Sequence, residues 1–345
     1  MVERPLLTRR RLLRLGGQAG LALGALGLAG CAPAGPVLVG SRGDLPAAWV
    51  SRLPKSWQLR LLDDPAAVLA SLSGGAPGVG RQRPALLQLS DGWASELGPE
   101  ALQPIATPEL LARLDPLAAP VARLFRPEGA PLLAFPWSLN PWVLVLRNRP
   151  DLVHRQAEGW GLLLDPSLRQ RLVLPSSPRV CLALVDQDPR RLRQLRQQAL
   201  ANDDRDALSL LLDGHAEAAV LPRQRVVTLL RRDPRLAVVV PPEGGPLGWN
   251  LLLRAAGASP PPLEWLGDAL EAPLLETLLQ AGWVPPLPRL RLEAATARFP
   301  AALRALLLPP PAVTARWRDL PPLSPAERSR LQRLWDEAAP QAGAG

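Results

Sequence analysis

The chain of 345 residues has no tyrosine and only two histidines. Neither His154 nor His215 has a second metal ligand at a spacing such as His-Glu-x-x-His, so the sequence predicts no metal site. A Gly-x-Ser-x-Gly nucleophile motif and a phosphate-binding, glycine-rich loop that ends in lysine are also missing. These absences argue against a metalloenzyme, a serine hydrolase and a nucleotide hydrolase. We therefore expect a protein that is not an enzyme and needs no cofactor.

Cysteine is nearly as scarce, with one residue at position 31 and the other at position 181. Cys181 lies between Val180 and Leu182, and an apolar setting raises the pKa of a thiol. A nucleophilic Cys181 with a histidine base is the alternative, but these neighbours favour a buried, unreactive thiol.

The N-terminal segment combines basic and apolar stretches in the order of an export signal. Residues 8–14 read TRRRLLR, and the uncharged residues 15–30 are fewer than the roughly 20 that span a bilayer. The basic stretch is similar to the twin-arginine export motif. Residues 28–31 (LAGC) are similar to the bacterial lipobox, in which the cysteine is lipidated after cleavage. The alternative is an ordinary apolar helix with a buried cysteine.

The signal predicts where the protein works. Removal of residues 1–30 would leave a chain that begins at a lipidated Cys31, held by its acyl chains on the periplasmic side of a bacterial membrane. Cys181 would then be the one remaining thiol, so an internal disulfide is excluded.

The net charge of +9 raises the question of nucleic-acid binding. Residues 1–30 contribute five Arg and one Glu, which leaves about +5 for the rest of the chain. No stripe of basic and aromatic residues is visible, and an exported protein rarely meets nucleic acid. We therefore expect no nucleic-acid partner.

Short apolar runs alternate with proline-started helices along the rest of the chain. Strands are expected at 37–39, 57–62, 85–89, 142–146, 172–174, 218–221 and 236–240. Helices are expected to begin after Asp64, Thr107 and Asp188, each followed by proline, and at the capping box that opens with Ser324. This alternation predicts an α/β fold with a sheet rich in parallel strands, covered on both faces.

Tryptophan stands out, with eleven residues. Trp93, Trp137 and Trp249 follow apolar runs in segments that we expect to be loops. Ligands of open α/β sheets bind at the carboxyl ends of the strands, so these rings are expected to line a pocket.

Several of these segments are similar to the extracellular solute-binding proteins of bacterial ABC transporters, most of all to the spermidine/putrescine-binding group. The segments that carry the resemblance are residues 136–140 (PWSLN), 160–174, 213–220 (DGHAEAAV), 242–249 (PEGGPLGW) and 281–285 (AGWVP). The resemblance spans nearly the whole chain after the signal. It implies a two-lobed periplasmic binding protein fold of type 2, with a central cleft between the lobes.

The resemblance also implies a division of the chain and a partner. Residues 31–140 and 250–345 would form lobe 1, and residues 141–249 would form lobe 2. A small solute would be held between the lobes and delivered to an ABC permease in the membrane.

The chain departs from the polyamine binders where their specificity lies. Their aspartates after the second-lobe strand are replaced here by Ser176 and Ser177, and Asn250 and Leu251 follow Trp249. A hydrogen bond between an ammonium group and a carboxylate contributes about 1.5–3 kcal/mol to binding. Because these carboxylates are missing, the sequence does not identify the solute. Asp91 and Glu243 remain as possible cation partners. Related iron-binding proteins hold ferric ion with tyrosine side chains. This chain has no tyrosine, so that mode of binding is excluded.

The sequence therefore predicts a solute-binding lipoprotein whose first candidate ligand is a polyamine or other small organic cation. Its expected ligand contacts are Asp91, Trp93, Trp137, Ser176, Ser177 and Trp249. Two alternatives remain: a surface lipoprotein that keeps the fold as a structural or assembly partner, and an exported hydrolase.

Overall fold

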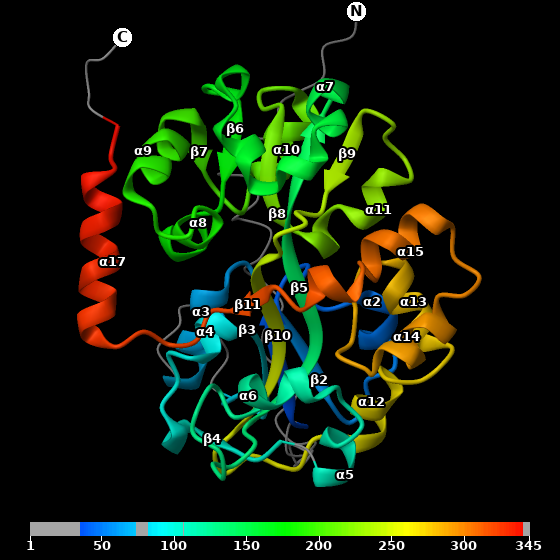
Figure 1. Cartoon of the computed structure of the whole chain (residues 1–345). Coiled ribbons are helices and arrows are strands. Elements are labelled where there is room, and N and C mark those ends of the chain that lie inside the picture. Colours follow the sequence, from blue (N-terminus) through cyan, green and yellow to red (C-terminus); the bar gives the residue numbers. More distant parts are fainter. Residues whose placement is uncertain (1–34, 74–81, 106, 341–345) are drawn as a thin grey trace, which may run out of the picture. The chain divides into compact units, whose positions relative to one another are not determined.

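In the part of the chain that the computed structural model describes, eleven strands form one mixed sheet, whose main path has the order β2-β1-β3-β10-β5-β8-β6-β7 (Figure 1). Strands β4 and β11 pair with β10, and β9 pairs with β5. The structure describes residues 35–73, 82–105 and 107–340. The predicted export signal and Cys31 lie outside these residues. The strands are β1 (Val37–Ser41), β2 (Gln58–Leu62), β3 (Leu86–Ser90), β4 (Leu102–Gln103), β5 (Ala134–Arg147), β6 (Leu172–Leu174), β7 (Ala199–Asn202), β8 (Ala218–Pro222), β9 (Leu236–Val239), β10 (Gly245–Ala255) and β11 (Trp317–Asp319).

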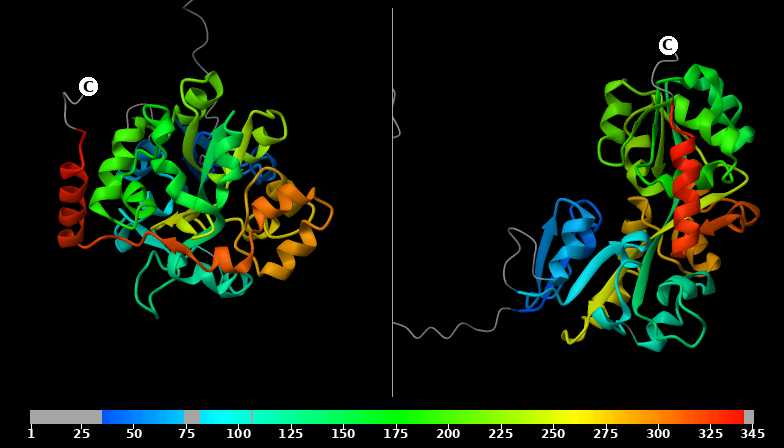
Figure 2. Two further views of the ribbon diagram at one scale, coloured as in Figure 1. Left: turned by 45° about the horizontal axis from the view of Figure 1, so that its top comes forward. Right: turned by 90° about the vertical axis from the view of Figure 1, so that its left-hand side faces the viewer.

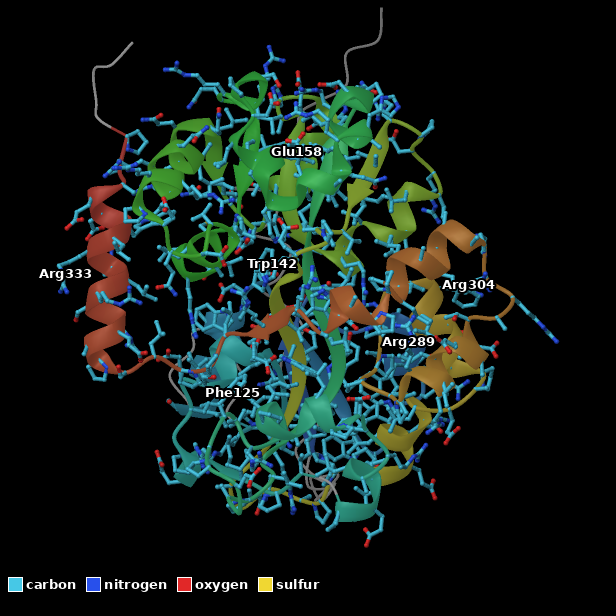
Figure 3. The ribbon with its side chains drawn as sticks, in the orientation of Figure 1. Phe125, Trp142, Glu158, Arg289, Arg304 and Arg333 are labelled. Atoms are coloured by element: carbon cyan, nitrogen blue, oxygen red, sulfur yellow. The ribbon has the colours of Figure 1, made fainter. Side chains whose placement is uncertain are left out.

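Strand β5 joins the two halves of this sheet. Its residues 134–141 pair antiparallel with β10, and its residues 142–147 pair antiparallel with β8 and β9. Trp142 is the first residue that pairs with β8 (Figure 3). We call β1–β4, β10, β11 and residues 134–141 the first half, and β6–β9 with residues 142–147 the second half.

The predicted parallel pairing is confirmed in both halves. Strand β1 lies parallel to β2 and β3, and β6 lies parallel to β7 and β8. The two long strands β5 and β10 add antiparallel pairs, so the sheet as a whole is mixed. The predicted strands at 37–39, 57–62, 85–89, 172–174, 218–221 and 236–240 match β1, β2, β3, β6, β8 and β9 within two residues.

The second half of the sheet is buried on both faces, as its continuously apolar strands predicted. Val143 and Val145 join one apolar cluster, while Leu144 and Leu146 join another on the opposite face. This alternation is the period of two that a β-strand imposes. A third and larger cluster fills the first half.

The helices cover these faces (Figure 2). They are α2 (Ala47–Val50), α3 (Pro65–Ala70), α4 (Asp91–Ala94), α5 (Pro108–Leu111), α6 (Ala119–Ala122), α7 (Pro150–His154), α8 (Pro178–Leu184), α9 (Pro189–Gln198), α10 (Ala207–Asp213), α11 (Val227–Leu230), α12 (Leu263–Asp268), α13 (Leu274–Gln280), α14 (Arg289–Ala295), α15 (Ala301–Leu307), α16 (Pro311–Thr314) and α17 (Pro325–Glu337). None of the helices in the described ranges is both long and apolar enough to cross a membrane.

Most predicted helix starts are confirmed by their caps. The side chains of Asp64 and Asp188 accept hydrogen bonds from the first turns of α3 and α9, and Ser324 forms the predicted capping box with Glu327. Helix α5 also begins at its predicted proline, but the Thr107 side chain makes no capping bond. A proline at the first position therefore starts this short helix without help from the residue before it.

Two segments expected to be loops are strands. Residues 136–141 belong to β5, and residues 245–250 belong to β10. Prolines at positions 136, 141 and 246 suggested loops, since proline cannot donate to a ladder. The residues beside these prolines pair β5 with β10. The register between the two strands shifts at Asn250 and Leu251.

The C-terminal helix α17 packs against the second half (Figure 2). Leu331 and Ala338 belong to the apolar cluster of α8 and α9, and the Arg196 guanidinium lies 4.0 Å from the centre of the Trp335 ring. The predicted division placed residues 250–345 in lobe 1. We propose instead that α17 belongs with lobe 2 and keep the other predicted boundaries as a proposal.

Candidate functional site

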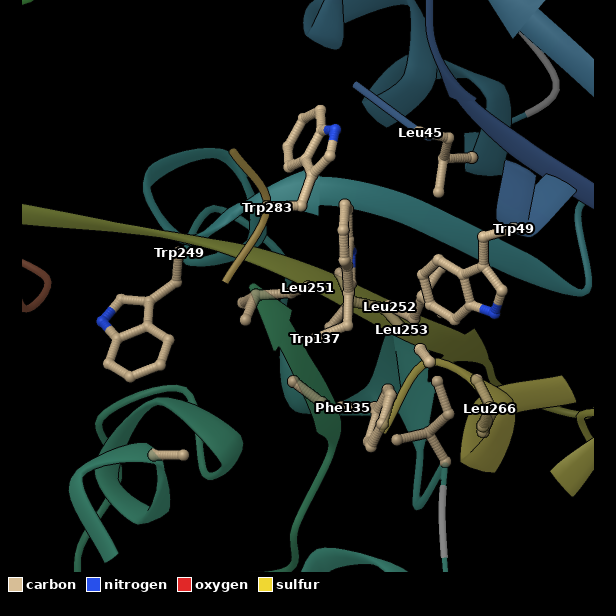
Figure 4. Close-up of a cluster of buried hydrophobic side chains, with 14 of the residues drawn as sticks. Leu45, Trp49, Phe135, Trp137, Trp249, Leu251, Leu252, Leu253, Leu266 and Trp283 are labelled. Atoms are coloured by element: carbon tan, nitrogen blue, oxygen red, sulfur yellow. The ribbon is translucent and has the colours of Figure 1, made fainter. Parts of the chain in front are cut away.

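Trp137 lies in the core of the first half (Figure 4). Its side chain is 0% exposed, and its ring centre lies 5.0 Å from that of Trp49 and 5.0 Å from that of Trp283. Strand β5 is central in the sheet, so both of its faces are covered. The ring therefore packs against protein, and we infer no contact between Trp137 and a solute.

The neighbouring pair Trp49 and Trp265 is held by two reciprocal hydrogen bonds. Each indole Nε1 donates to the backbone carbonyl of the other residue, at 2.8 and 2.9 Å, and the rings stack 4.3 Å apart. By contrast, Trp137 Nε1 has no partner among the described residues.

We expect this difference to appear in stability. Trp49→Phe leaves the buried carbonyl of Trp265 without its donor, which costs about 1–3 kcal/mol beyond the lost packing. Trp137→Phe loses packing alone. In urea unfolding, the free energy of unfolding of Trp49→Phe should be lower than that of Trp137→Phe by that margin. Equal losses would contradict the reciprocal bonds.

Trp249 on β10 connects two carboxyl groups. Its backbone N–H donates to Asp91 Oδ1 at 3.2 Å, and its indole Nε1 donates to Asp319 Oδ1 at 2.7 Å. The side chain is 1% exposed. Trp249 thus fixes the two carboxylates rather than offering a face of its ring to solvent.

Asp91 follows β3 and begins α4, with 7% of its surface exposed. Burial raises the pKa of Asp91 to about 7, helped by repulsion from Asp319. Hydrogen bonds from the backbone N–H groups of Trp249 and Gly92 act in the opposite direction. Asp91 forms no ion pair within 4.0 Å to any residue that the structure describes.

The other predicted contacts lie at the surface. Trp93 on α4 is 39% exposed. Ser176 is exposed, and its backbone N–H and hydroxyl both donate to the carboxylate of Asp204. Ser177 is the residue before α8 and makes no capping bond with its side chain. The structure thus brings Asp91 and Trp249 into contact, while Trp93, Ser176 and Ser177 stay predictions.

A cavity of about 780 Å³ lies beside Asp319. Its wall comes from α8, the start of β10, strand β11 and the segment that leads to α17. Its polar and aromatic lining residues are Glu158, Trp160, Arg179, Asp186, Gln187, Arg191, Glu243, Arg316, Arg318 and Asp319. The first turn of α8, the start of β10 and the end of β11 therefore line the same cavity.

Several charged side chains on this wall have partners within the protein. Arg318 pairs with Asp186 at 3.1 Å, and Arg191 lies 4.0 Å from the same carboxylate. Glu158 pairs with Arg155 at 2.7 Å. The carboxylate of Glu243 accepts a hydrogen bond from the backbone N–H of Trp160 at 2.6 Å.

Arg179 and Asp319 differ from these neighbours. Both are partly buried, and neither forms an ion pair within 4.0 Å in the described part of the chain. Burial lowers the pKa of Arg179, and attraction to Asp91 and Glu327 partly offsets that shift. Burial raises the pKa of Asp319, and the bond from Trp249 partly offsets that shift. Glu243 and Arg316 on the same wall also form no ion pair in the described ranges, but both are exposed, so Arg179 and Asp319 stand out as the partly buried charges without an ion pair.

Glycine lets the chain turn at the cavity wall. Gly244 has a φ of +77°, and a Cβ there would collide with the backbone carbonyl of Arg316. Gly257 has a similar φ of +75°, but nothing lies within 4 Å of the position that a Cβ would take there. The two glycines share the backbone strain and differ in the space around them.

We expect Gly244→Ala to destabilise the protein far more than Gly257→Ala. The left-handed backbone costs about 1–2 kcal/mol in both variants. The clash with Arg316 adds strain typical of overpacking, about 1–3 kcal/mol more, in Gly244→Ala alone. Thermal unfolding of both variants measures the difference, and equal melting temperatures would contradict the close approach at the cavity wall.

No group of three or more His, Cys, Asp or Glu side chains in the described ranges is arranged to hold a metal ion. Cys181 is fully buried in α8, as predicted, and burial raises the pKa of its thiol to about 12. Such a thiol is a poor nucleophile at neutral pH.

No family model matches the sequence, and no curated protein matches it. Solved structures do match. A putative spermidine/putrescine ABC transporter from Listeria monocytogenes has a TM-score of 0.65 at 14% identity, over 88% of this chain and 98% of its own. PotD, the spermidine/putrescine substrate-binding protein of Streptococcus pneumoniae, gives 0.68 at 12% identity over the same shares. The chain has the fold of these substrate-binding proteins.

Proteins that share this two-lobed α/β fold bind different solutes. The periplasmic binding protein MotA of A. tumefaciens, solved in complex with glucopine, matches with a TM-score of 0.61 at 13% identity, over 88% of this chain and 98% of its own. At such identities the likeness establishes the fold, and the solute must be argued from the side chains.

Sequence patterns pointed to only part of this site. Glu243, a possible cation partner in the sequence, lies on the cavity wall. Arg179 and Trp160 also line the cavity, but the sequence did not indicate a pocket role for either. Asp319 lies 70 residues after Trp249, and no local pattern indicates that β11 pairs with the start of β10.

Proposed function

We propose that the chain is the exported substrate-binding protein of an ABC importer. Its solute would bind in the cavity of Arg179 and Asp319 and carry a positively charged group. One observation carries this proposal: a fold shared with solute binders places a partly buried carboxylate without a counter-ion on the wall of a cavity. An ammonium group beside Asp319 would supply that counter-ion in a partly desolvated setting.

Asp91 supports a cationic group as well. Its carboxylate accepts a hydrogen bond from the Trp249 N–H, and its pKa is raised by burial and further by repulsion from Asp319. Two neighbouring carboxylates are more easily ionised together when a cation lies near them. A polyamine was the first candidate from the sequence, and two of the structural neighbours are named for spermidine and putrescine.

Delivery to a permease would follow from a change in shape. Two-lobed binding proteins close around a solute, so a bound solute shifts the population toward the closed form. We include in the proposal the twin-arginine export and the lipid anchor at Cys31, which would hold the protein beside its permease.

A thermal-shift screen of the purified protein tests the binding function. The panel would hold polyamines, amino acids, sugars and anions. A solute at 100 times its dissociation constant should stabilise the folded protein by about 2.7 kcal/mol. Asp319→Asn should weaken the response to that solute, while Asp213→Asn, an exposed aspartate on α10, should leave it unchanged.

The burial of Trp137 and Trp249 favours a second candidate, a lipoprotein that keeps the fold but does not transport. Two of the three tryptophans expected to contact an organic cation, Trp137 and Trp249, are buried in this structure. Absence of a shift with every member of the panel would favour this candidate over the importer.

A further inference from the structure

We propose that the solute is zwitterionic, with a carboxylate or similar anionic group that binds Arg179 and an ammonium group that binds Asp319. This inference rests on the proposed function, because it assigns a chemical class to the solute of the same cavity. It departs from the polyamine predicted from the sequence, which carries positive charge alone.

The two charged groups come from separate elements that meet at the cavity. Arg179 is the second residue of α8, and Asp319 is the last residue of β11. Both line the cavity and both are partly buried, so water screens them less than it screens the exposed Arg316 and Arg318. The two residues line one cavity and form no ion pair within 4.0 Å among the described residues, and we infer that a solute lies between them.

Each group is held in place and still has free bonding capacity. Asp319 Oδ1 accepts from Trp249 Nε1 at 2.7 Å, and no described residue donates to Oδ2. Arg179 Nη2 donates to the carbonyl oxygen of Pro321. A guanidinium carries five N–H donors, so several remain for an anionic group. These bonds orient the two side chains before any solute arrives.

The nearest additional charges are Asp91 and the group around Asp186. Asp91 accepts a hydrogen bond from the Trp249 N–H, repels Asp319 and attracts Arg179. Arg191 and Arg318 share the single carboxylate of Asp186 on the cavity wall. A diamine would bring one of its ammonium groups toward Arg179, and a diacid would bring a carboxylate toward Asp319. A molecule with one group of each sign avoids both repulsions.

A matched series of four-carbon compounds tests the inference by isothermal titration calorimetry. Putrescine has two ammonium groups, 4-aminobutanoate has one ammonium and one carboxylate, and succinate has two carboxylates. We expect 4-aminobutanoate to bind at least tenfold more tightly than either of the others. The three-, five- and six-carbon amino acids and diamines extend the comparison if the cavity prefers another length.

Arg179→Gln identifies the anion partner. It should weaken binding of the amino acid by more than tenfold and change diamine binding little, or strengthen it. Arg193→Gln on α9 removes the same charge from an exposed position and should leave both affinities unchanged. Circular dichroism of each variant confirms that it is folded.

The outcomes separate this inference from the proposed function. Tighter binding of diamines than of amino acids at every length would overturn the zwitterion and leave the binding function standing. Failure of every amino acid to bind would also overturn it, and failure of the diamines as well would remove the proposed function. Unchanged amino-acid binding by Arg179→Gln would overturn the role of Arg179.

Discussion

Replacing Asp91 by asparagine should stabilise the protein at neutral pH and change its stability little at pH 4. Burial raises the pKa of Asp91 to about 7, whereas an aspartate in an unfolded chain has a pKa near 4. Between these values the unfolded state loses its proton and the folded state keeps it. The free energy of unfolding of the native protein therefore falls by about 1.4 kcal/mol per pH unit through this range.

The loss in the free energy of unfolding that the raised pKa of Asp91 causes approaches about 4 kcal/mol at pH 7 and above. Asparagine cannot ionise and can still accept the hydrogen bond from the Trp249 N–H, so the variant escapes this loss. Denaturant unfolding of both proteins from pH 4 to pH 8 should show a difference that grows with pH in favour of Asp91→Asn.

The exposed Asp213 provides the control for this series. Asp213→Asn removes the same charge and should show no comparable growth with pH. A difference between Asp91→Asn and the native protein that stays constant from pH 4 to pH 8 would mean that Asp91 ionises normally in the fold.

Solute affinity should rise with pH up to about 7 and level off above it. An ammonium group bound to Asp319 adds positive charge near Asp91 and favours its ionised form, while in the free protein Asp91 holds its proton below pH 7. Each pH unit below this value should then weaken binding of 4-aminobutanoate by up to about tenfold. The charged groups that act on Asp91 are Asp319, which opposes its ionisation, and Arg179, which favours it.

Calorimetry in two buffers with different ionisation enthalpies measures the proton that accompanies binding. We expect the native protein to release up to one proton at pH 6, and Asp91→Asn to release clearly less. The residual release reports on Asp319, whose pKa is also raised by burial. Equal proton release by the native protein and the variant would contradict the role of Asp91.

Much of the fold could be predicted from local patterns. Strand β6 was expected over the residues where it occurs, and Asp188 caps α9 as its position before proline predicted. These features depend on neighbours in the sequence, such as apolar side chains in a short run or an acceptor one residue before a helix. Such signals are local, and at these two elements the rest of the structure agrees with them.

The tryptophans show where local patterns fail. Trp137 and Trp249 stand close to prolines, which suggested loops and an exposed pocket wall. Both lie on the long central strands β5 and β10, which are covered on both faces. Whether an indole faces a ligand or the core depends on the layers packed over the sheet, and nothing in the nearby sequence reports these.

The cavity depends on contacts between distant residues. Strand β11 pairs with the start of β10, more than 70 residues away, and the chain then continues to α17 on the second half. This course brings Pro321 to Arg179 and places Asp319 on the wall of the same cavity. No pattern near Ser176 and Ser177 indicates that a carboxylate from β11 lines this cavity.

Binding of a solute between Arg179 and Asp319 is tested most directly by a crystal structure of the protein grown with 4-aminobutanoate. A second crystal, grown with putrescine, provides the comparison. We predict density for the amino acid in this cavity, with its ammonium beside the Asp319 carboxylate and its carboxylate beside Arg179. A cavity that holds neither compound would contradict the proposed site.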